Sequence, residues 1–376
     1  MSNEHTLDPA RFISSRCNAV DASGIRKVFD LAGKMKDPIN FSIGQPDYDV
    51  DEPVKQAAIA AIRAGHNGYT VTQGIAPLRE GLTARLTAEL GFEPAVLVVS
   101  GVAGGLFLSL MTCVNPGDEV IFLDPYFVMY RHLVNLVGGT PVAVDSYPDF
   151  AVPIDRVEAA ITDRTKAIIL NSPGNPTGVV FDADALGAVA DLARRHDLVV
   201  ISDEIYCDLS FDGVSPSPAP LAPERTILLR GFSKGHGMTG WRLGYAAGPQ
   251  VLIEGMTKLQ QFTYVCAPSI VQHAGVAALD VAVTGHVEDY TRKRDLVCAE
   301  LEGRFDFVRP SGGFYVFPQA PAAYASATDF VERAIERNVL IIPGQVFSAR
   351  DTHFRISYAT DDDSIRRGCT ILRDLA

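Results

Sequence analysis

Short apolar runs rich in valine and isoleucine alternate with stretches of helical length from about Pro38 onward. Residues 166–202 show one full unit: an apolar run, a loop, a helix-like stretch near residues 182–196 and a second apolar run. Runs that are apolar on both faces are typical of parallel strands covered by helices. The sequence therefore predicts an α/β fold with a large, mostly parallel sheet of the seven-stranded type. The predicted strands are residues 96–100, 119–123, 141–144, 167–170, 198–202 and 227–230.

The pattern changes after about residue 280. The elements predicted there are a helix, a strand beside a double glycine, a helix, two short strands and a final helix; the first five cover residues 287–303, 312–317, 329–338, 340–342 and 353–358. This order is typical of an α+β domain. We predict a large domain over residues 45–283, a smaller domain over 284–376, and an N-terminal arm over 1–44 that packs with the smaller domain.

Lys234 lies just after an apolar run that would deliver it, as the end of a strand, to the ligand-binding edge of the sheet. Most lysines are solvated, and that alternative applies to Lys234 taken alone. A lysine placed in an apolar site has a lowered pKa, which leaves its amine free to act as a nucleophile near neutral pH. Its neighbours in the sequence favour this second interpretation.

Asp203 ends another apolar run, and a carboxylate buried there needs a cationic partner. A protonated pyridine nitrogen fits, because the ion pair lets the ring withdraw electrons. Tyr206 and Asn175 lie in loops at the same predicted edge and offer donors to a phenolate oxygen. Taken alone, the segment Ser202-Asp203-Glu204 can equally be a helix cap.

Gly101, Val102 and Ala103 follow a predicted strand and open a helix-like segment, where free N–H groups and the helix dipole favour an anion. A turn glycine at a strand–helix junction is the alternative interpretation of Gly101. Arg242 offers a planar fork of donors suited to phosphate. Phe127 follows a predicted strand and can stack on an aromatic ring, with core packing as its alternative.

Arg355 lies on a predicted strand of the smaller domain, where its guanidinium can hold a substrate carboxylate in bidentate fashion. Gly44 would let the backbone approach that carboxylate closely. A Schiff-base amine, a partner for a pyridinium nitrogen, donors for a phenolate oxygen and a phosphate clamp are together the requirements of pyridoxal 5′-phosphate (PLP). The sequence therefore predicts PLP as the cofactor.

Four motifs resemble those of fold-type I PLP enzymes of the class I/II aminotransferase family: SPGNPTG at residues 172–178, SDEIY at 202–206, GFSKGHGMTGWRLGY at 231–245 and FRIS at 354–357. The resemblance runs from about Ile39 to the C-terminus. It implies that Lys234 is the Schiff-base lysine, that Asp203 pairs with the pyridine nitrogen, and that Asn175 and Tyr206 contact the phenolate oxygen. It further implies that Arg242, Ser233 and the backbone at Val102 and Ala103 hold the phosphate, and that Arg355 holds the substrate carboxylate.

The resemblance also implies a homodimer with shared active sites. Tyr69, in Gly-Tyr-Thr, matches a tyrosine that such enzymes lend to the phosphate of the neighbouring subunit. Two positions depart from the family pattern: Gly231 replaces a common Ser or Thr at the phosphate, and Ala103 stands where some aspartate-using relatives carry lysine. With no clear second arginine for a dicarboxylate, a neutral or aromatic amino donor is favoured.

The predicted activity is transfer of the α-amino group of an L-amino acid to a 2-oxo acid, with 2-oxoglutarate or pyruvate as candidate acceptors. An aspartate aminotransferase and a PLP-dependent C–S β-lyase are the alternatives. The lyase would release ammonia and pyruvate and would leave no amino group on the cofactor.

Composition excludes several other classes of protein. A net charge of -12 supplies no basic excess for nucleic acid. The six cysteines are scattered without CxxC spacing, so neither a disulfide framework nor a metal site is predicted. The N-terminus lacks an apolar signal segment, and the apolar runs are far shorter than the roughly 20 residues of a transmembrane helix. We predict a cytoplasmic protein with no membrane partner.

Overall fold

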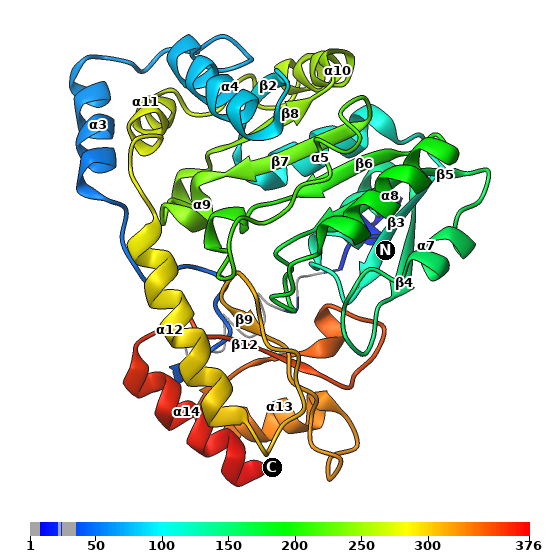
Figure 1. The fold of residues 1–376 in the computed structure, drawn as a ribbon, viewed down its shortest axis with the longest axis vertical. Coiled ribbons are helices and arrows are strands. Elements are labelled where there is room, and N and C mark those ends of the chain that lie inside the picture. Colours follow the sequence, from blue (N-terminus) through cyan, green and yellow to red (C-terminus); the bar gives the residue numbers. More distant parts are fainter. Residues whose placement is uncertain (1–7, 22–23, 25–34) are drawn as a thin grey trace, which may run out of the picture.

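The computed structural model describes residues 8–21, 24 and 35–376. Parts of the predicted N-terminal arm, residues 1–7, 22–23 and 25–34, lie outside the described residues. Figure 1 shows a broad sheet with helices on both sides and, below it, a smaller group of helices and short strands that includes the C-terminus.

The large sheet has seven strands in the order β2-β8-β7-β6-β5-β3-β4. Their bounds are β2 (Ala95–Val99), β3 (Glu119–Asp124), β4 (Thr140–Asp145), β5 (Thr165–Asn171), β6 (Val199–Asp203), β7 (Thr226–Gly231) and β8 (Gly244–Gly248). Only β8 runs antiparallel to its neighbours, β2 and β7, so the other six strands share one direction. The predicted α/β fold is confirmed, and the carboxyl ends of six strands meet at one edge.

Helices cover both faces of the sheet. One face carries α5 (Gly101–Cys113), α6 (Met129–Val137) and α10 (Gln250–Gln261), and the other carries α7 (Ile154–Ala159) and α8 (Ala183–Arg195). Successive side chains of β3 serve the two cores in turn, since Val120 and Phe122 pack with the first group of helices and Ile121 and Leu123 with the second. A third core beside β2 is built by α3 (Glu52–Arg63), α4 (Ala76–Leu90) and α11 (Ser269–Ala278).

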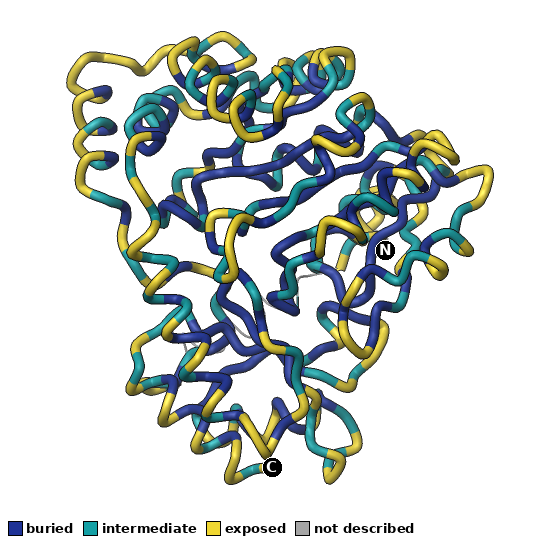
Figure 2. Tube along the Cα trace, viewed as in Figure 1, coloured by how far each residue is buried: buried dark blue, intermediate teal, exposed yellow. Residues whose placement is uncertain are grey.

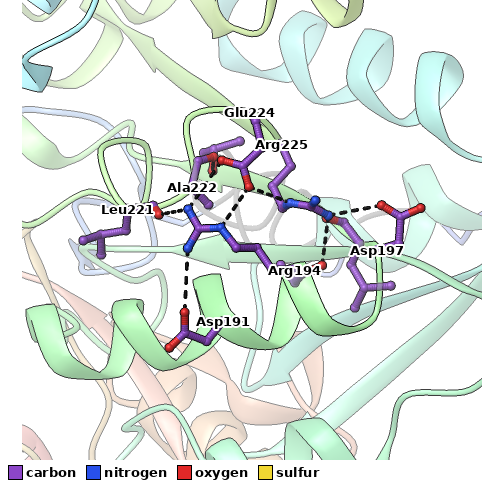
Figure 3. Close-up of polar contacts among 10 residues, drawn as sticks. Asp191, Arg194, Asp197, Leu221, Ala222, Glu224 and Arg225 are labelled. Carbon is purple, nitrogen blue, oxygen red and sulfur yellow. Dashed lines mark hydrogen bonds and ion pairs between the residues drawn. The ribbon is translucent and has the colours of Figure 1, made fainter.

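The C-terminal end of α8 is fastened to the turn that precedes β7 (Figure 3). Glu224 in that turn accepts hydrogen bonds from the Nε atoms of Arg194, at 3.0 Å, and Arg225, at 2.9 Å. Arg225 also donates to the Ala193 carbonyl on α8, at 3.0 Å, and pairs with Asp197 at 3.3 Å. The two arginines thereby fix the register of α8 against the sheet.

The smaller part contains α12 (Thr284–Leu301), α13 (Ala327–Glu336) and α14 (Asp362–Leu375), with β1 (Ile39–Asn40), β9 (Tyr315–Val316), β10 (Val339–Leu340), β11 (Ile342–Pro343) and β12 (Phe354–Ser357). The helices α12 and α14 lie side by side (Figure 1). β1 pairs in parallel with β10, so residues from the N-terminal side of the chain join this part. The short elements are η1 (Pro9–Phe12), α1 (Ser15–Asn18), η2 (Cys207–Leu209), α9 (Phe232–Gly235), η3 (Thr239–Trp241) and η4 (Gly344–Val346).

Figure 2 shows buried strands in the large sheet and exposed outer surfaces on the helices around it. Helix α12 begins at Thr284, the residue at which the smaller domain was predicted to start, and the domain boundaries themselves stay predictions. Within the described part of the chain, no helix combines the length and apolarity needed to cross a membrane.

Candidate active site

A cavity of about 630 Å³ opens at the edge of the sheet where the parallel strands end. It is lined by Val20, Asp21, Ser42, Ile43, Gly44, Val102, Ala103, Leu106, Phe127, Val128, Met129, His132, Asn171, Asn175, Asp203, Ile205, Tyr206, Ser233, Lys234, Thr239, Arg242, Tyr315 and Arg355. Most of the predicted site residues therefore surround one space, although they are scattered from Gly44 to Arg355 in the sequence. The exceptions are Gly101 and Tyr69.

Lys234 is positioned by β7, which ends at Gly231, and by the short helix α9 that follows. Its Nζ donates a hydrogen bond of 2.5 Å to the Gly44 carbonyl. Burial, together with the positive charges of Arg355 and Arg242, lowers the pKa of Lys234 to about 7. A substantial neutral fraction of this amine is therefore present at neutral pH, as nucleophilic chemistry requires.

Asp203 is the last residue of β6 and is 2% exposed. Burial raises the pKa of its carboxyl to about 6, against a hydrogen bond of 2.7 Å that Tyr130 donates to Oδ2. Among the described residues, no cationic side chain forms an ion pair with Asp203 at 4.0 Å or less. A cationic ring nitrogen in the cavity would meet this need.

Asn175 and Tyr206 line the wall of the cavity beside Asp203. The Asn175 Oδ1 accepts a hydrogen bond of 2.9 Å from Arg355, which directs the amide oxygen toward the arginine and leaves the amide N–H groups for another acceptor. The Tyr206 hydroxyl lies 3.0 Å from the Tyr315 hydroxyl. Burial raises the pKa of Tyr206 well above its usual value, so the phenol keeps its proton.

Arg355 comes from β12 of the smaller part and is 1% exposed. Its Nη2 donates to the Ser42 carbonyl at 2.8 Å, and its guanidinium lies 4.4 Å from the Tyr315 ring centroid. The buried Nε of Arg355 has no hydrogen-bond partner within the described chain. Gly44 lies against Tyr315, because a Cβ at Gly44 would come within 2.7 Å of the Tyr315 hydroxyl.

Gly101 begins helix α5 with a φ of +65°, a conformation that favours glycine. A Cβ at this position would collide with the Arg242 guanidinium, so the glycine allows the arginine to lie at the helix N-terminus. Arg242 itself has a φ of 57° and donates to the Thr239 carbonyl at 3.0 Å. With Ser233 buried in the cavity wall, these residues make a corner of the cavity whose donors and positive charge suit an anion.

Phe127 lines the cavity and contacts Tyr130 edge to face at 5.8 Å, so it takes part both in the cavity wall and in aromatic packing. Tyr69 lies outside the cavity and is 87% exposed. Its predicted role toward a neighbouring subunit stays a prediction.

Sequence reasoning did not single out Tyr130, Tyr315 or His132, all of which border the site. His132 lies on α6, and its buried Nδ1 has no hydrogen-bond partner among the described residues. Tyr130 lies four residues after Tyr126 and three after Phe127, a helical spacing that was its available signal, whereas His132 gave none. Tyr315 gave no signal beyond the neighbouring double glycine.

Comparison with known proteins gives consistent matches. The family described as aminotransferase class I and II matches residues 36–372. An aspartate aminotransferase of Pyrococcus abyssi is 38% identical over 93% of this chain and 94% of its own length. An aromatic-amino-acid aminotransferase of Thermococcus litoralis is 37% identical, with coverages of 93% and 94%. A solved structure of aspartate aminotransferase from Thermus thermophilus with maleate superposes with a TM-score of 0.93, at 36% identity and coverages of 97% and 99%.

Proposed function

Because the chain belongs to the aminotransferase class I and II family and is therefore an enzyme of that family, we propose that it is a PLP-dependent aminotransferase acting on neutral or aromatic L-amino acids. The observation that carries this proposal is that the half-buried Lys234, whose amine has a pKa lowered to about 7, lines one cavity with Asp203, Arg242 and Arg355. These residues match the chemical needs of PLP one by one.

The donor set fits the cofactor. Asp203 would pair with the ring nitrogen, and Asn175 and Tyr206 would donate to the phenolate oxygen. Arg242, Ser233 and the N–H groups at Val102 and Ala103 would hold the phosphate at the start of α5, with Phe127 beside the ring. Gly101 keeps that corner open for Arg242. When bound, PLP supplies an aldehyde that captures the substrate amine and a ring that withdraws electrons from its Cα.

The chain's own residues would then orient the substrate and move its proton. Arg355 would bind the α-carboxylate and fix which bond at Cα faces the ring. Lys234, neutral in part at pH 7, would accept the Cα proton and return it to the carbon on the cofactor side. Tyr206 and Asn175 would hold the phenolate oxygen in place during this transfer.

The side-chain preference rests on the cavity wall. Val20, Leu106, Val128 and Met129 supply apolar surface, and Ala103 carries no charge. Among the described lining residues, the cationic side chains are Lys234, Arg242 and Arg355, all of which have proposed partners. A neutral or aromatic donor is therefore favoured over a dicarboxylate, although the relatives' names make aspartate the alternative to test.

The test is the absorption spectrum of the PLP-loaded protein while single L-amino acids are added without an oxo acid. We expect stoichiometric conversion of PLP to pyridoxamine phosphate by aromatic or large neutral donors and much slower conversion by aspartate. Rapid conversion by aspartate alone would replace the proposed donor class. Ammonia and pyruvate accumulating while PLP stays unchanged would identify the C–S β-lyase instead.

The variant Lys234→Ala tests the proposed role of Lys234. Its turnover should be at least about 10⁴-fold lower than that of the parent, because the proton carrier is removed, while PLP still binds through its other contacts. Measured activity within tenfold of the parent enzyme would contradict the role of Lys234.

A further inference from the structure

The helix that carries Lys234 is only four residues long, Phe232–Gly235. The last carbonyls of a helix receive no hydrogen bond from the N–H groups of that helix. The Lys234 and Gly235 carbonyls therefore need donors from elsewhere. Buried carbonyls left without donors are costly. The Phe232 carbonyl accepts from the backbone N–H of His236 within the segment, so the carbonyls that still need donors are those of Lys234 and Gly235. A group that donates to these two carbonyls therefore helps to determine the position of the Lys234 backbone.

Tyr48 supplies that donor. Its hydroxyl donates to the Lys234 carbonyl at 2.5 Å and lies 3.2 Å from the Gly235 carbonyl. Burial, with the nearby carboxylates of Asp208 and Asp47, raises the pKa of Tyr48 far above its usual value. The phenol thus keeps its proton throughout the pH range in which an enzyme works.

Lys234 is consequently held at both ends by one segment. Its Nζ donates to the Gly44 carbonyl at 2.5 Å, and its own carbonyl accepts from Tyr48, four residues further along. The backbone of Tyr48 also packs closely on the loop after α9, since a Cβ at Gly237 would lie 3.2 Å from the Tyr48 carbonyl oxygen.

This segment is in turn fastened to α12. The Tyr48 ring stacks on His286 with 3.6 Å between centroids and 5° between planes. Asp47 accepts a hydrogen bond of 2.9 Å from Tyr290 and pairs with Lys293 at 2.5 Å. Three side chains of α12 therefore contact Asp47 and Tyr48, and Tyr48 is the residue that donates to the Lys234 carbonyl.

We propose that Tyr48 is a positioning residue that holds the Lys234 backbone in register with the Gly44 carbonyl and ties it to α12. This rests on the proposed role of Lys234 and adds a residue that acts through it. Without the hydroxyl, the lysine would sample more backbone orientations, and the reactive alignment of its amine would be less populated.

Tyr48→Phe tests this, because it keeps the ring stacked on His286 and removes only the hydroxyl. PLP is added to the PLP-free protein, and the rate at which lysine-linked PLP forms is followed by absorbance. We expect a rate about 5- to 20-fold lower than in the parent. In the loaded enzyme, kcat should fall by a similar factor with KM changed less than about twofold, and the isotope effect with a Cα-deuterated donor should increase.

Tyr147→Phe is the matched control, since it removes a buried phenol hydroxyl that contacts Ser348 at 3.1 Å and does not line the cavity. Tyr290→Phe, which loses the bond to Asp47 but not the Tyr48 hydroxyl, should change the same quantities in the same direction by less. If Tyr48→Phe matched Tyr147→Phe in linkage rate and in isotope effect, the positioning role would be wrong. A parent protein that forms no lysine-linked PLP would instead overturn the proposed function.

Discussion

At the scale of single residues, the buried carboxylate of Asp203 lowers the stability of the PLP-free protein, and a bound PLP would remove this destabilisation. Burial raises its pKa to about 6, whereas an unfolded chain has an Asp pKa of about 3.9. The folded PLP-free protein therefore binds more protons than the unfolded chain between about pH 4 and 6, and its stability falls as pH rises through that interval. The full cost, present above about pH 6, is about 2 to 3 kcal/mol.

Asp203→Asn should accordingly stabilise the PLP-free protein by about 1 to 3 kcal/mol at pH 8 and have no such effect at pH 4. Asparagine can still accept the hydrogen bond from Tyr130 without the buried charge.

The same variant, Asp203→Asn, should lower turnover by about 100-fold or more, because the ring nitrogen loses its charged partner. Urea unfolding at the two pH values and steady-state kinetics measure both effects. A PLP-free variant less stable than the parent at pH 8 would contradict the assignment.

The site residues that the sequence predicted lie at ends of strands or in short motifs, where position along the chain already limits geometry. Asp203 ends a buried strand, Lys234 and Asn175 come shortly after two others, and the three side chains meet in one cavity. Tyr48 and Tyr130 could not be found in this way, because each acts by a contact across more than seventy residues: Tyr48 to the Lys234 carbonyl and Tyr130 to Asp203. Tertiary packing alone determines such partners.

At the scale of elements, Glu224 connects α8 to the turn before β7. Burial alone would raise its pKa, but its own backbone N–H, Arg225 and Arg194 donate to it and lower the pKa to about 2. A carboxyl with a depressed pKa in the folded state stabilises the protein above about pH 4.3, and this contribution is lost as pH falls toward 2.

Glu224→Gln should therefore reduce the free energy of unfolding at pH 7 by about 0.5 to 1 kcal/mol, a modest value because the side chain is half exposed. The difference from the parent should shrink steadily between pH 4 and pH 2 in urea unfolding. Glu93→Gln is the control, since Glu93 is exposed and forms no ion pair with the described residues. Equal effects of the two substitutions at pH 7 would refute the role of this network.

One strand rich in small residues was not revealed by the sequence pattern, and two predicted strands have other bounds. β8 (Gly244–Gly248) was not predicted because it lacks β-branched residues, yet close packing requires its glycines: a Cβ at Gly248 would lie 2.5 Å from the Thr226 carbonyl oxygen. The strand predicted at residues 312–317 spans only Tyr315–Val316, because Gly313 has a φ of +70°. The predicted strand at 340–342 divides at Ile341 into β10 and β11, which pair with different partners.

At the scale of the whole molecule, Tyr69 supports the proposal of a homodimer with shared active sites. It is 87% exposed and lies outside the cavity, between α3 and α4, with Val71 60% exposed beside it. An exposed tyrosine with an exposed valine two residues later offers the aromatic and apolar surface that contacts between two copies of a chain use. Tyr69→Phe should weaken PLP binding about tenfold, the value of one hydrogen bond to a charged phosphate.

Mixed dimers distinguish a shared site from a surface residue that acts only within its own chain. When Tyr69→Phe and Lys234→Ala chains are refolded together, a shared site gives each mixed dimer one intact site, with Lys234 from the first chain and Tyr69 from the second. At PLP concentrations too low to load Tyr69→Phe alone, activity should rise to about one quarter of the parent value, because half the dimers are mixed and each has one working site of two. If Tyr69 served only its own chain, mixing would restore nothing, since no subunit would then combine an intact Tyr69 with an intact Lys234. Activity at the average of the two separate preparations would thus exclude the shared arrangement while leaving the chemistry of Lys234 untouched.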